Sequence, residues 1–296
     1  FMGTLLAISI ITDDIYRGIF EQLVEGIGMT IFVSAASYIV ALMIAVFVGI
    51  VRSNPPTPPQ TTETTSQTIV RIFKTFIYNL CTVYVSVMRG LPVLIVLLVT
   101  AFIIVPAVRD LVNNSAITGL RNVTGNPEIG DLFWRGSSAP SAIMALAATY
   151  GAYMSETIRA GIQSIPKGQV EAAYSVGMTY FQTMRHIVLP QAFRNVLPPL
   201  GNDFVAMIKD SSLLAFLGVR DVTQVAKTSA GRSFRYVETY AIVAFIYLTL
   251  VIIAQTVVNL LEDTINVNRD TPKFVQRLSE IFGTNGKRKR ETESFD

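Results

Sequence analysis

The sequence predicts an all-α membrane protein with about five transmembrane helices, and three observations lead to that fold class. Of the 296 residues, 51% are apolar and only 15% are charged, whereas about 25% of the residues of an ordinary soluble domain are charged. The mean hydropathy is +0.46. Four stretches of at least 19 residues also contain no Asp, Glu, Lys or Arg, and about 20 apolar residues are enough for a helix to cross a bilayer. The solvent around much of this chain is therefore expected to be a membrane.

The four uncharged stretches mark four of the spans. We expect these spans at about residues 26–51, 90–108, 137–158 and 238–261, which are rich in Ile, Val, Leu, Ala and Phe. One such stretch alone is typical of a buried core helix. Four in a single chain favour membrane helices.

A fifth span, at about residues 192–218, is apolar overall but contains charged residues. A charge at the centre of a spanning helix costs roughly 2.5–3.5 kcal/mol on insertion scales, so these side chains should face a cavity or a partner helix. Pro198 and Pro199 remove backbone donors and should bend the helix. A bent, polar span is a candidate for lining a pathway. Its charged residues are Arg194, Asp203, Lys209 and Asp210.

Residues 75–88 form a sixth, shorter uncharged stretch. Its 14 residues are too few for a straight span, and we interpret it as an interfacial or partly inserted helix. A true span at this place is the alternative and would give six spans.

The Lys and Arg residues set the orientation, because cytoplasmic loops of membrane proteins carry an excess of them. With five spans, one side of the membrane holds 15 of these residues and the other holds 8. The side with 15 is predicted to be cytoplasmic, which puts the N-terminal segment 1–25 outside, together with an outer loop at 109–136. The cytoplasmic parts are a proline-rich linker at 53–68, a loop at 165–190 and a basic tail at 266–296. We interpret the KRKR run of this tail as a positive-inside anchor, and binding to anionic membrane lipid is the alternative.

The composition also excludes several kinds of site. With one His and one Cys, the chain cannot form a disulfide by itself or a zinc site of several His and Cys. The net charge of +3 gives no reason to expect nucleic-acid binding. The sequence also lacks the GxxxxGK[ST] phosphate-binding loop, so we expect no ATP site on this chain.

The cytoplasmic loop 165–190 has the most informative pattern. Good helix formers on an amphipathic pattern predict a helix over 169–180, in which Gly177 would allow another surface to approach closely. An ordinary interfacial helix would fit this pattern equally well. The loop also contains Glu171-Ala172-Ala173, then Gly177 after three residues, and Ile187-x-Leu189-Pro190 after nine more. This spacing resembles the EAA-x3-G-x9-I-x-L-P loop of ABC importer permeases.

Further stretches resemble the polar amino-acid branch of that family, of the histidine, glutamine and arginine type. They are residues 89–92, 155–168, 200–204 and 209–213, and the resemblance covers about residues 24–265. Leu91 and Asp203 stand where this branch more often has Thr and Glu.

The resemblance implies a type I ABC importer permease fold in the bacterial inner membrane, with an EAA coupling helix in the cytoplasm. Two such permeases, identical or related, would pair, and each would dock a separate ATP-binding subunit that holds the ATP and Mg. An extracytoplasmic protein would deliver the amino acid. The chain itself would be a transport component and not an enzyme. The residues that would transmit movement of the ATP-binding subunit to the membrane helices of this chain are Glu171, Ala172, Ala173 and Gly177.

An amino acid carries an ammonium and a carboxylate group, so its pathway needs both acceptors and donors. Tyr153 lies at the end of the third span. Glu156, Asn202 and Asp203 could hold the ammonium group or a basic side chain. Lys209, with Ser211 and Ser212, could hold the carboxylate. The alternative is structural: Lys209 would pair with Asp210, and Glu156 with Arg159 or Arg194.

Two other functions fit parts of the sequence. A stand-alone, ion-coupled secondary transporter or channel would use Lys209 and Asp210 as an ion relay, although five spans without an internal repeat are few for that class. A membrane-embedded hydrolase would need a nucleophile beside a base. Only Ser211 or Ser212 with Lys209 suggests one.

Overall fold

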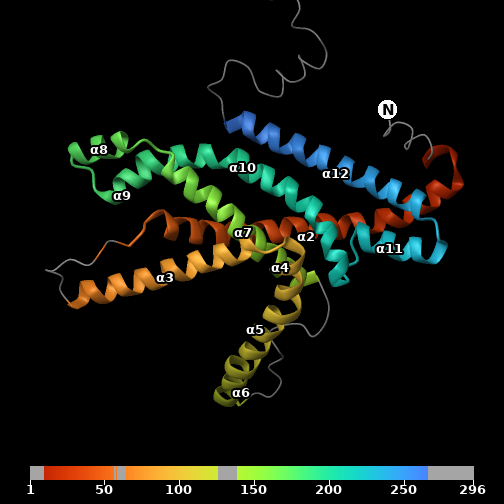
Figure 1. Cartoon of the computed structure of the whole chain (residues 1–296), viewed down its shortest axis with the longest axis horizontal. Helices are drawn as coiled ribbons and strands as arrows, with labels where there is room; N and C mark the ends of the chain where they lie inside the picture. Colours follow the sequence, from red (N-terminus) through yellow and green to blue (C-terminus); the bar gives the residue numbers. More distant parts are fainter. Residues whose placement is uncertain (1–9, 57, 59–64, 126–138, 266–296) are drawn as a thin grey trace, which may run out of the picture.

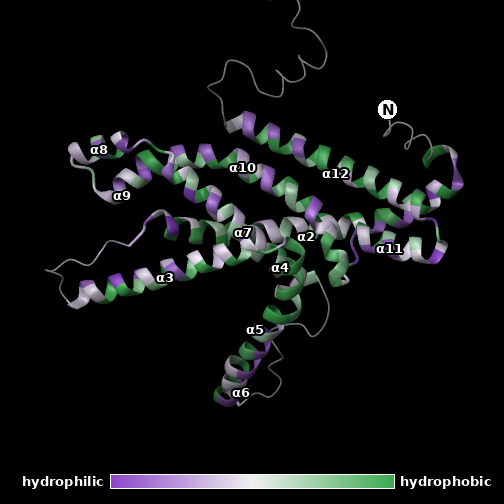
Figure 2. Ribbon diagram, viewed as in Figure 1, coloured by the Kyte–Doolittle hydropathy of each residue, from purple (hydrophilic) through white to green (hydrophobic). Residues whose placement is uncertain are grey.

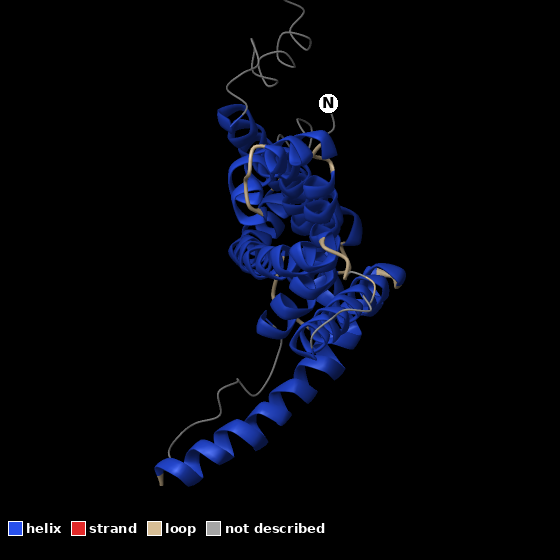
Figure 3. Ribbon diagram, turned by 90° about the vertical axis from the view of Figure 1, so that its left-hand side faces the viewer, coloured by secondary structure: helices blue, strands red, loops and turns tan. Residues whose placement is uncertain are grey.

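The computed structural model describes residues 10–56, 58, 65–125 and 139–265. Every regular element in these ranges is a helix (Figure 3), which confirms the predicted all-α fold class. The predicted basic tail 266–296 and residues 57 and 59–64 of the predicted proline-rich linker lie outside the described residues. Three helices in the described part of the chain are long and apolar enough to cross a membrane: Asp14–Ser53, Val93–Thr124 and Tyr236–Thr264.

The centre of the molecule is a pair of helices, α2 (Asp14–Ser53) and α7 (Ala139–Gln163), which lie side by side. Small side chains let them approach closely. A Cβ atom on Gly49 would stand 2.9 Å from the Ser155 carbonyl oxygen, and one on Gly151 would stand 2.9 Å from Ile44 Cγ2. Glycine at these two positions therefore fixes the spacing between α2 and α7.

The other long helices pack around this pair. α10 (Leu189–Asp210) contacts α7 and α2, α12 (Tyr236–Ile265) covers α10, and α3 (Thr65–Gly90) lies on the opposite side along α2 and α7 (Figure 1). α10 continues without interruption through both of its internal prolines and ends in a tight 3₁₀ turn, η4 (Ser211–Leu217).

α2 begins 12 residues before the predicted span. The Asp13 side chain accepts the backbone N–H of Ile15 at 2.9 Å and caps the helix. A search for uncharged stretches does not find this first part of α2, because the part contains charged residues. Such residues are unfavourable inside a bilayer, but they do not prevent a helix from forming. The predicted outer segment 1–25 is thus partly an extension of α2.

α3 is longer than the predicted helix at residues 75–88. Its 26 residues extend about 39 Å at 1.5 Å per residue. Cys81 and Val85 are buried on the side that faces α2 and α7, whereas Phe73 and Phe76 are more than 60% exposed. The helix extends past Arg71 and Lys74 because an amphipathic helix can place charges away from its packed side.

After α3 the helical structure is interrupted at Leu91-Pro92. The chain then continues as a helical arm that projects from the bundle (Figures 1 and 3). The arm contacts the bundle near its base, at α7 and η4, and its base is strongly apolar (α4, green in Figure 2). Residues 109–124 of the predicted outer loop belong to this helical arm, in which the Arg109–Asp110 pair at 2.8 Å keeps both charges on the helix surface. The arm consists of α4 (Val93–Val99), η1 (Thr100–Ile104), α5 (Val105–Val112), η2 (Asn113–Ile117) and α6 (Thr118–Thr124).

Two groups of short elements lie at opposite ends of the molecule. α8 (Lys167–Ser175), α9 (Tyr180–Thr183) and η3 (Met184–Val188) connect α7 to α10 at one end. α11 (Val222–Ser233) connects η4 to α12 at the other (Figure 1).

Candidate functional site

The predicted coupling loop is a helix–turn–helix at one end of the molecule. α8 ends at Ser175, where Gly177 adopts a left-handed φ of +83°. The N–H groups of Gly177 and Met178 donate to the carbonyl oxygens of Tyr174 and Ala173 at 2.9 and 3.1 Å. This is the hydrogen-bond pattern of a Schellman motif, which favours glycine at its left-handed position.

The predicted single helix over residues 169–180 is therefore wrong. Gly177 does not stand inside a helix at a close approach, since a Cβ atom there would meet nothing within 4 Å. The glycine is needed for its backbone conformation. The next helix, α9, starts at Tyr180 and is preceded by a capping box between Thr179 and Gln182.

The EAA residues are divided between the surface and the interior. Ala173 is only 3% exposed and holds α8 against its neighbours. Glu171 and Ala172 are exposed, and several apolar side chains of α8, α9 and the turn between them are exposed as well. Exposed apolar groups of this kind mark interaction surfaces. The group consists of Tyr174, Val176, Tyr180 and Phe181.

Polar contacts tie this end of the molecule to the central helices. Arg52, at the end of α2, donates to the Glu156 carboxylate of α7 at 2.5 Å, and Arg159 pairs with the same carboxylate. Asn54 donates to the Tyr180 hydroxyl at 2.5 Å. The Glu156 carboxylate is thus held by two arginines, one of them the Arg159 partner that the structural alternative named.

A second polar group lies inside the bundle, where α2, α7 and α10 meet. The Tyr38 hydroxyl donates to the Leu200 carbonyl oxygen at 3.1 Å, and the Tyr150 hydroxyl donates to Asp210 at 2.8 Å. Beside them, Asp203 Oδ2 is buried and has no hydrogen-bond partner among the described residues. An unpartnered buried carboxylate oxygen is costly unless a donor arrives, so Asp203 is the residue of this group whose hydrogen bonding is incomplete.

The remaining predicted pathway residues have different surroundings. Tyr153 lies under the Arg89 guanidinium, whose central carbon is 5.5 Å from the ring centroid. Asn202 and Lys209 are exposed. Ser211 is fully buried and donates to the Ile208 carbonyl oxygen at 2.7 Å, so its hydroxyl proton is already used. Ser212 follows on the same turn and is partly exposed.

Three residues of these two groups were missed by the sequence reasoning. Tyr38 and Tyr150 each lie within a predicted span, and Arg52 lies directly after one. A search for charges inside spans overlooks neutral hydroxyls. A tyrosine in an apolar span is nevertheless a signal, because its hydroxyl needs a partner when it is buried.

A comparison with protein families now identifies the chain. The model of the family described as "Binding-protein-dependent transport system inner membrane component" matches residues 68–267. The chain belongs to this family. It is therefore an inner-membrane component of a transport system, and not itself an enzyme.

Relatives and solved structures agree with the family. The chain is 32% identical over 243 residues to the probable amino-acid ABC transporter permease protein YckA of Bacillus subtilis, a match that covers 82% of this chain and 88% of the relative. It is 27% identical to the glutamine transport system permease protein GlnP of Escherichia coli, with 81% and 91% covered. The crystal structure of an amino acid ABC transporter with histidines matches with a TM-score of 0.60 and 27% identity, and covers 82% of this chain and 93% of its own. The predicted permease fold is thereby confirmed.

Proposed function

We propose that this chain is the permease subunit of an ATP-driven importer of polar amino acids. It pairs with an identical or related permease, and the two form the translocation pathway. The observation that carries the proposal is the α8–α9 element, because it presents Glu171 and Ala172 on an exposed short helix at one end of the bundle. The named relatives, which are amino-acid and glutamine permeases, support the substrate class.

The α8–α9 element is the coupling site for a separate ATP-binding subunit, which holds ATP and Mg. Glu171 and Ala172, with the exposed apolar side chains of α8, α9 and the turn between them, contact that subunit. Ala173 anchors α8, and Gly177 sets its end. Movement of α8 is transmitted to α2 and α7 through the Tyr180–Asn54 and Glu156–Arg52 contacts. It thereby biases the bundle between two states, as a coupling between distant sites requires.

The pathway is lined by the polar residues of α7, α10 and η4. Asp203, whose free carboxylate oxygen needs a donor, receives the ammonium group or a basic side chain of the amino acid, with Asn202 beside it. Lys209 and Ser212 receive the carboxylate, and Tyr153 lies along the same route. Glu156 and Ser211 are engaged by protein partners, so they position helices and do not bind the substrate directly.

The α8–α9 element marks the cytoplasmic end of the molecule, where α12, the last described helix, also ends. The opposite end, with α11, faces outward and receives an extracytoplasmic amino-acid-binding protein. Membrane lipid surrounds the apolar helices.

A bulky residue at an exposed motif position tests the coupling site. Ala172→Trp should abolish ATP-driven amino-acid uptake in vesicles that contain the whole transporter, because the added ring would keep α8 away from the ATP-binding subunit. The variant should still insert into the membrane, since Ala172 is exposed. Ala116→Trp, at an exposed alanine of the arm, is the control and should transport normally. Normal uptake by Ala172→Trp would overturn the proposed coupling site.

A further inference from the structure

Arg89, in the last turn of α3, carries a guanidinium group without a polar partner. Its central carbon lies 5.5 Å from the ring centroid of Tyr153 on α7. Within the described residues, Arg89 takes part in no hydrogen bond and no ion pair. Arg89 is exposed and Tyr153 is partly exposed, so a solute can reach both side chains. The five N–H donors of the guanidinium are therefore available to a ligand.

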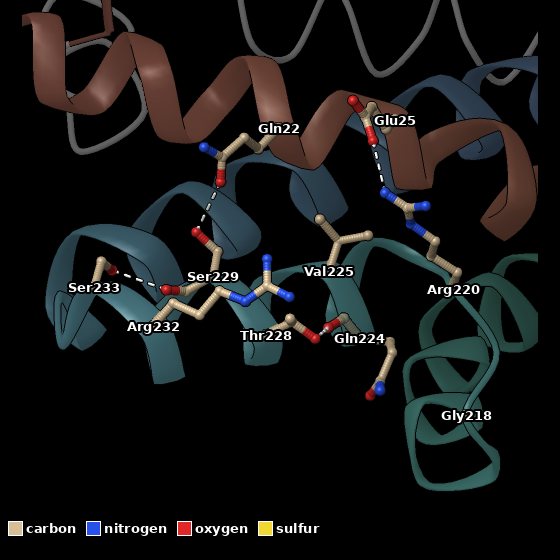
Figure 4. Close-up of a pocket in the computed structure, with 10 residues that line it drawn as sticks. All are labelled: Gln22, Glu25, Gly218, Arg220, Gln224, Val225, Thr228, Ser229, Arg232 and Ser233. Atoms are coloured by element: carbon tan, nitrogen blue, oxygen red, sulfur yellow. Dashed lines mark hydrogen bonds and ion pairs between the residues drawn. The ribbon is translucent and has the colours of Figure 1, made fainter.

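Other charged side chains of the molecule do have polar partners. Arg220 lines a cleft between α2 and α11 and pairs with Glu25 at 3.0 Å (Figure 4). Asp221 accepts the Gln224 N–H at 2.8 Å and caps α11. Arg89 differs from these residues because it contacts the face of a ring, and a guanidinium on a ring face can still donate N–H groups to an anion.

The helix that carries Arg89 is fixed against α7. The Tyr84 hydroxyl of α3 donates to the Ala148 carbonyl oxygen of α7 at 2.5 Å. Val85 is 3% exposed and packs in the same contact. α3 ends at Gly90, directly after Arg89. The backbone of Arg89 is thus held in place, and the ring contact orients its guanidinium. Both restraints reduce the freedom that the side chain would lose when it binds a ligand.

Tyr153 also connects Arg89 to the polar group inside the bundle. Tyr150 and Tyr153 are neighbours on α7, with ring centroids 6.3 Å apart. The Tyr150 hydroxyl donates to Asp210 at 2.8 Å. A row of two aromatic rings therefore has a carboxylate at one end and a guanidinium at the other. Tyr153 lies three residues closer than Tyr150 to the α8–α9 end of α7, so Arg89 stands at the inner end of this row.

We propose that Arg89 and Tyr153 form a carboxylate-binding station on the amino-acid pathway. This rests on the proposed function, in which Tyr153 lies along the route. The Arg89 guanidinium binds the α-carboxylate through two parallel, charge-assisted hydrogen bonds, and Tyr153 is the positioning residue beneath it. Coming from outside, the amino acid meets Lys209 at the end of α10 first. It reaches Arg89 next, one turn further along α7.

A lipid phosphate is the other anion that an exposed arginine attracts. The surroundings of Arg89 favour the amino acid, because Tyr150 is only 6% exposed. The row of rings therefore leads from Arg89 into the interior of the protein. A lipid headgroup would use the guanidinium alone and would have no contact with Tyr150 or Asp210.

Substrate analogues test the station. The permease pair with its ATP-binding subunits is purified in detergent, and ligand binding is measured by equilibrium dialysis without binding protein. The ligands are L-arginine, L-glutamine, L-argininamide and L-glutaminamide, and the two amides lack the carboxylate. Wild type should bind at least one amino acid about tenfold or more tightly than its amide, because the amide cannot form the charged pair. Arg89→Gln should bind that amino acid about tenfold more weakly and its amide with unchanged affinity.

Two further substitutions separate the pair from general effects on structure. Arg89→Lys keeps a positive charge and should retain part of the preference for the amino acid over its amide. Arg220→Gln is the matched control, because it removes the same charge from an exposed arginine outside the pathway, and it should bind all four ligands like the wild type. Tyr153→Phe keeps the ring and should keep the preference, whereas Tyr153→Leu should reduce it.

Three results would overturn the station. The first is an Arg89→Gln variant with the wild-type preference for the amino acid, which is also the result expected if Arg89 served only a lipid phosphate. The second is an equal loss of affinity for amino acid and amide, which a merely structural role would produce. The third is a wild type that binds neither amino acid or does not distinguish them from their amides. The proposed function depends on ATP-driven uptake, a separate measurement, and it stands or fails independently of these results.

Discussion

The contact between α2 and α11 depends on the absence of a side chain at Gly26, and Gly26→Ala should disrupt it. The new Cβ atom would stand 2.5 Å from the Val222 nitrogen and 2.7 Å from the Val222 Cα and the Asp221 carbonyl carbon. All three are backbone atoms, which cannot rotate away. Ordinary contact begins near 3.5 Å, so α11 must move by roughly 1 Å.

That movement has a cost that can be worked out from the structure. The hydrogen bond from the Val222 N–H to Thr30 Oγ1 is already 3.3 Å long and would break. Val222 is fully buried, and an unsatisfied buried N–H costs about 1–3 kcal/mol. Overpacking adds about 1–3 kcal/mol. We therefore expect Gly26→Ala to destabilise the protein by about 2–6 kcal/mol in total.

Thermal unfolding of the purified protein in detergent measures this effect. Gly28→Ala is the matched control, because it lies on the same helix and its Cβ atom would meet nothing within 4 Å. Alanine is a better helix former than glycine by about 1 kcal/mol, so Gly28→Ala should unfold at the same or a higher temperature. Gly26→Ala should unfold several degrees lower. Equal unfolding temperatures for the two variants would refute the backbone contact between α2 and α11.

Three further substitutions test other contacts. Gly161→Ala should destabilise the junction of α7 and α10 because its Cβ atom would overlap Val196 Cγ1; Val196→Ala in the same chain should restore the unfolding temperature, and failure of that rescue would contradict the packing. Gly177→Ala should lower ATP-driven uptake, because the left-handed conformation costs a non-glycine residue about 1–2 kcal/mol, whereas Gly177→Asn should retain most uptake; the two variants transporting equally would argue against the turn. Asp221→Ala should lower the unfolding temperature through loss of the α11 cap, worth about 1 kcal/mol, whereas Asp221→Asn keeps a capping oxygen, removes a buried charge and should unfold near the wild-type temperature.

Much of the fold follows from patterns that the sequence shows directly. Apolar runs must be removed from water, so the long helices α2, α7 and α12 were expected close to where they lie. The exposure of Glu171 and Ala172 on a short helix between two long ones also agrees with the spacing of the EAA pattern. These features depend on local periodicity and on burial, which a single sequence encodes.

Other features depend on contacts between distant residues and could not be predicted in this way. A search for uncharged runs stops at Arg109, yet the arm continues as helix to Thr124 because charged side chains can extend from a helix surface without interrupting its backbone. The same search passes over α11, whose start is fixed by the Asp221 cap and whose position is fixed by Gly26, nearly 200 residues earlier in the chain. From the sequence alone, the Glu156 carboxylate suits a substrate and a structural pair equally well, because its Arg52 partner lies on another helix, about 100 residues away in the chain.

We expect this chain to move amino acids only when a separate ATP-binding subunit drives it. The most direct test is uptake of labelled L-glutamine and L-arginine into vesicles that contain the chain with its pairing permease, its ATP-binding subunit and its binding protein. At least one polar amino acid should accumulate, and its accumulation should require ATP, the ATP-binding subunit and the binding protein together. Accumulation by the chain alone, driven by an ion gradient without any ATP-binding subunit, would contradict it.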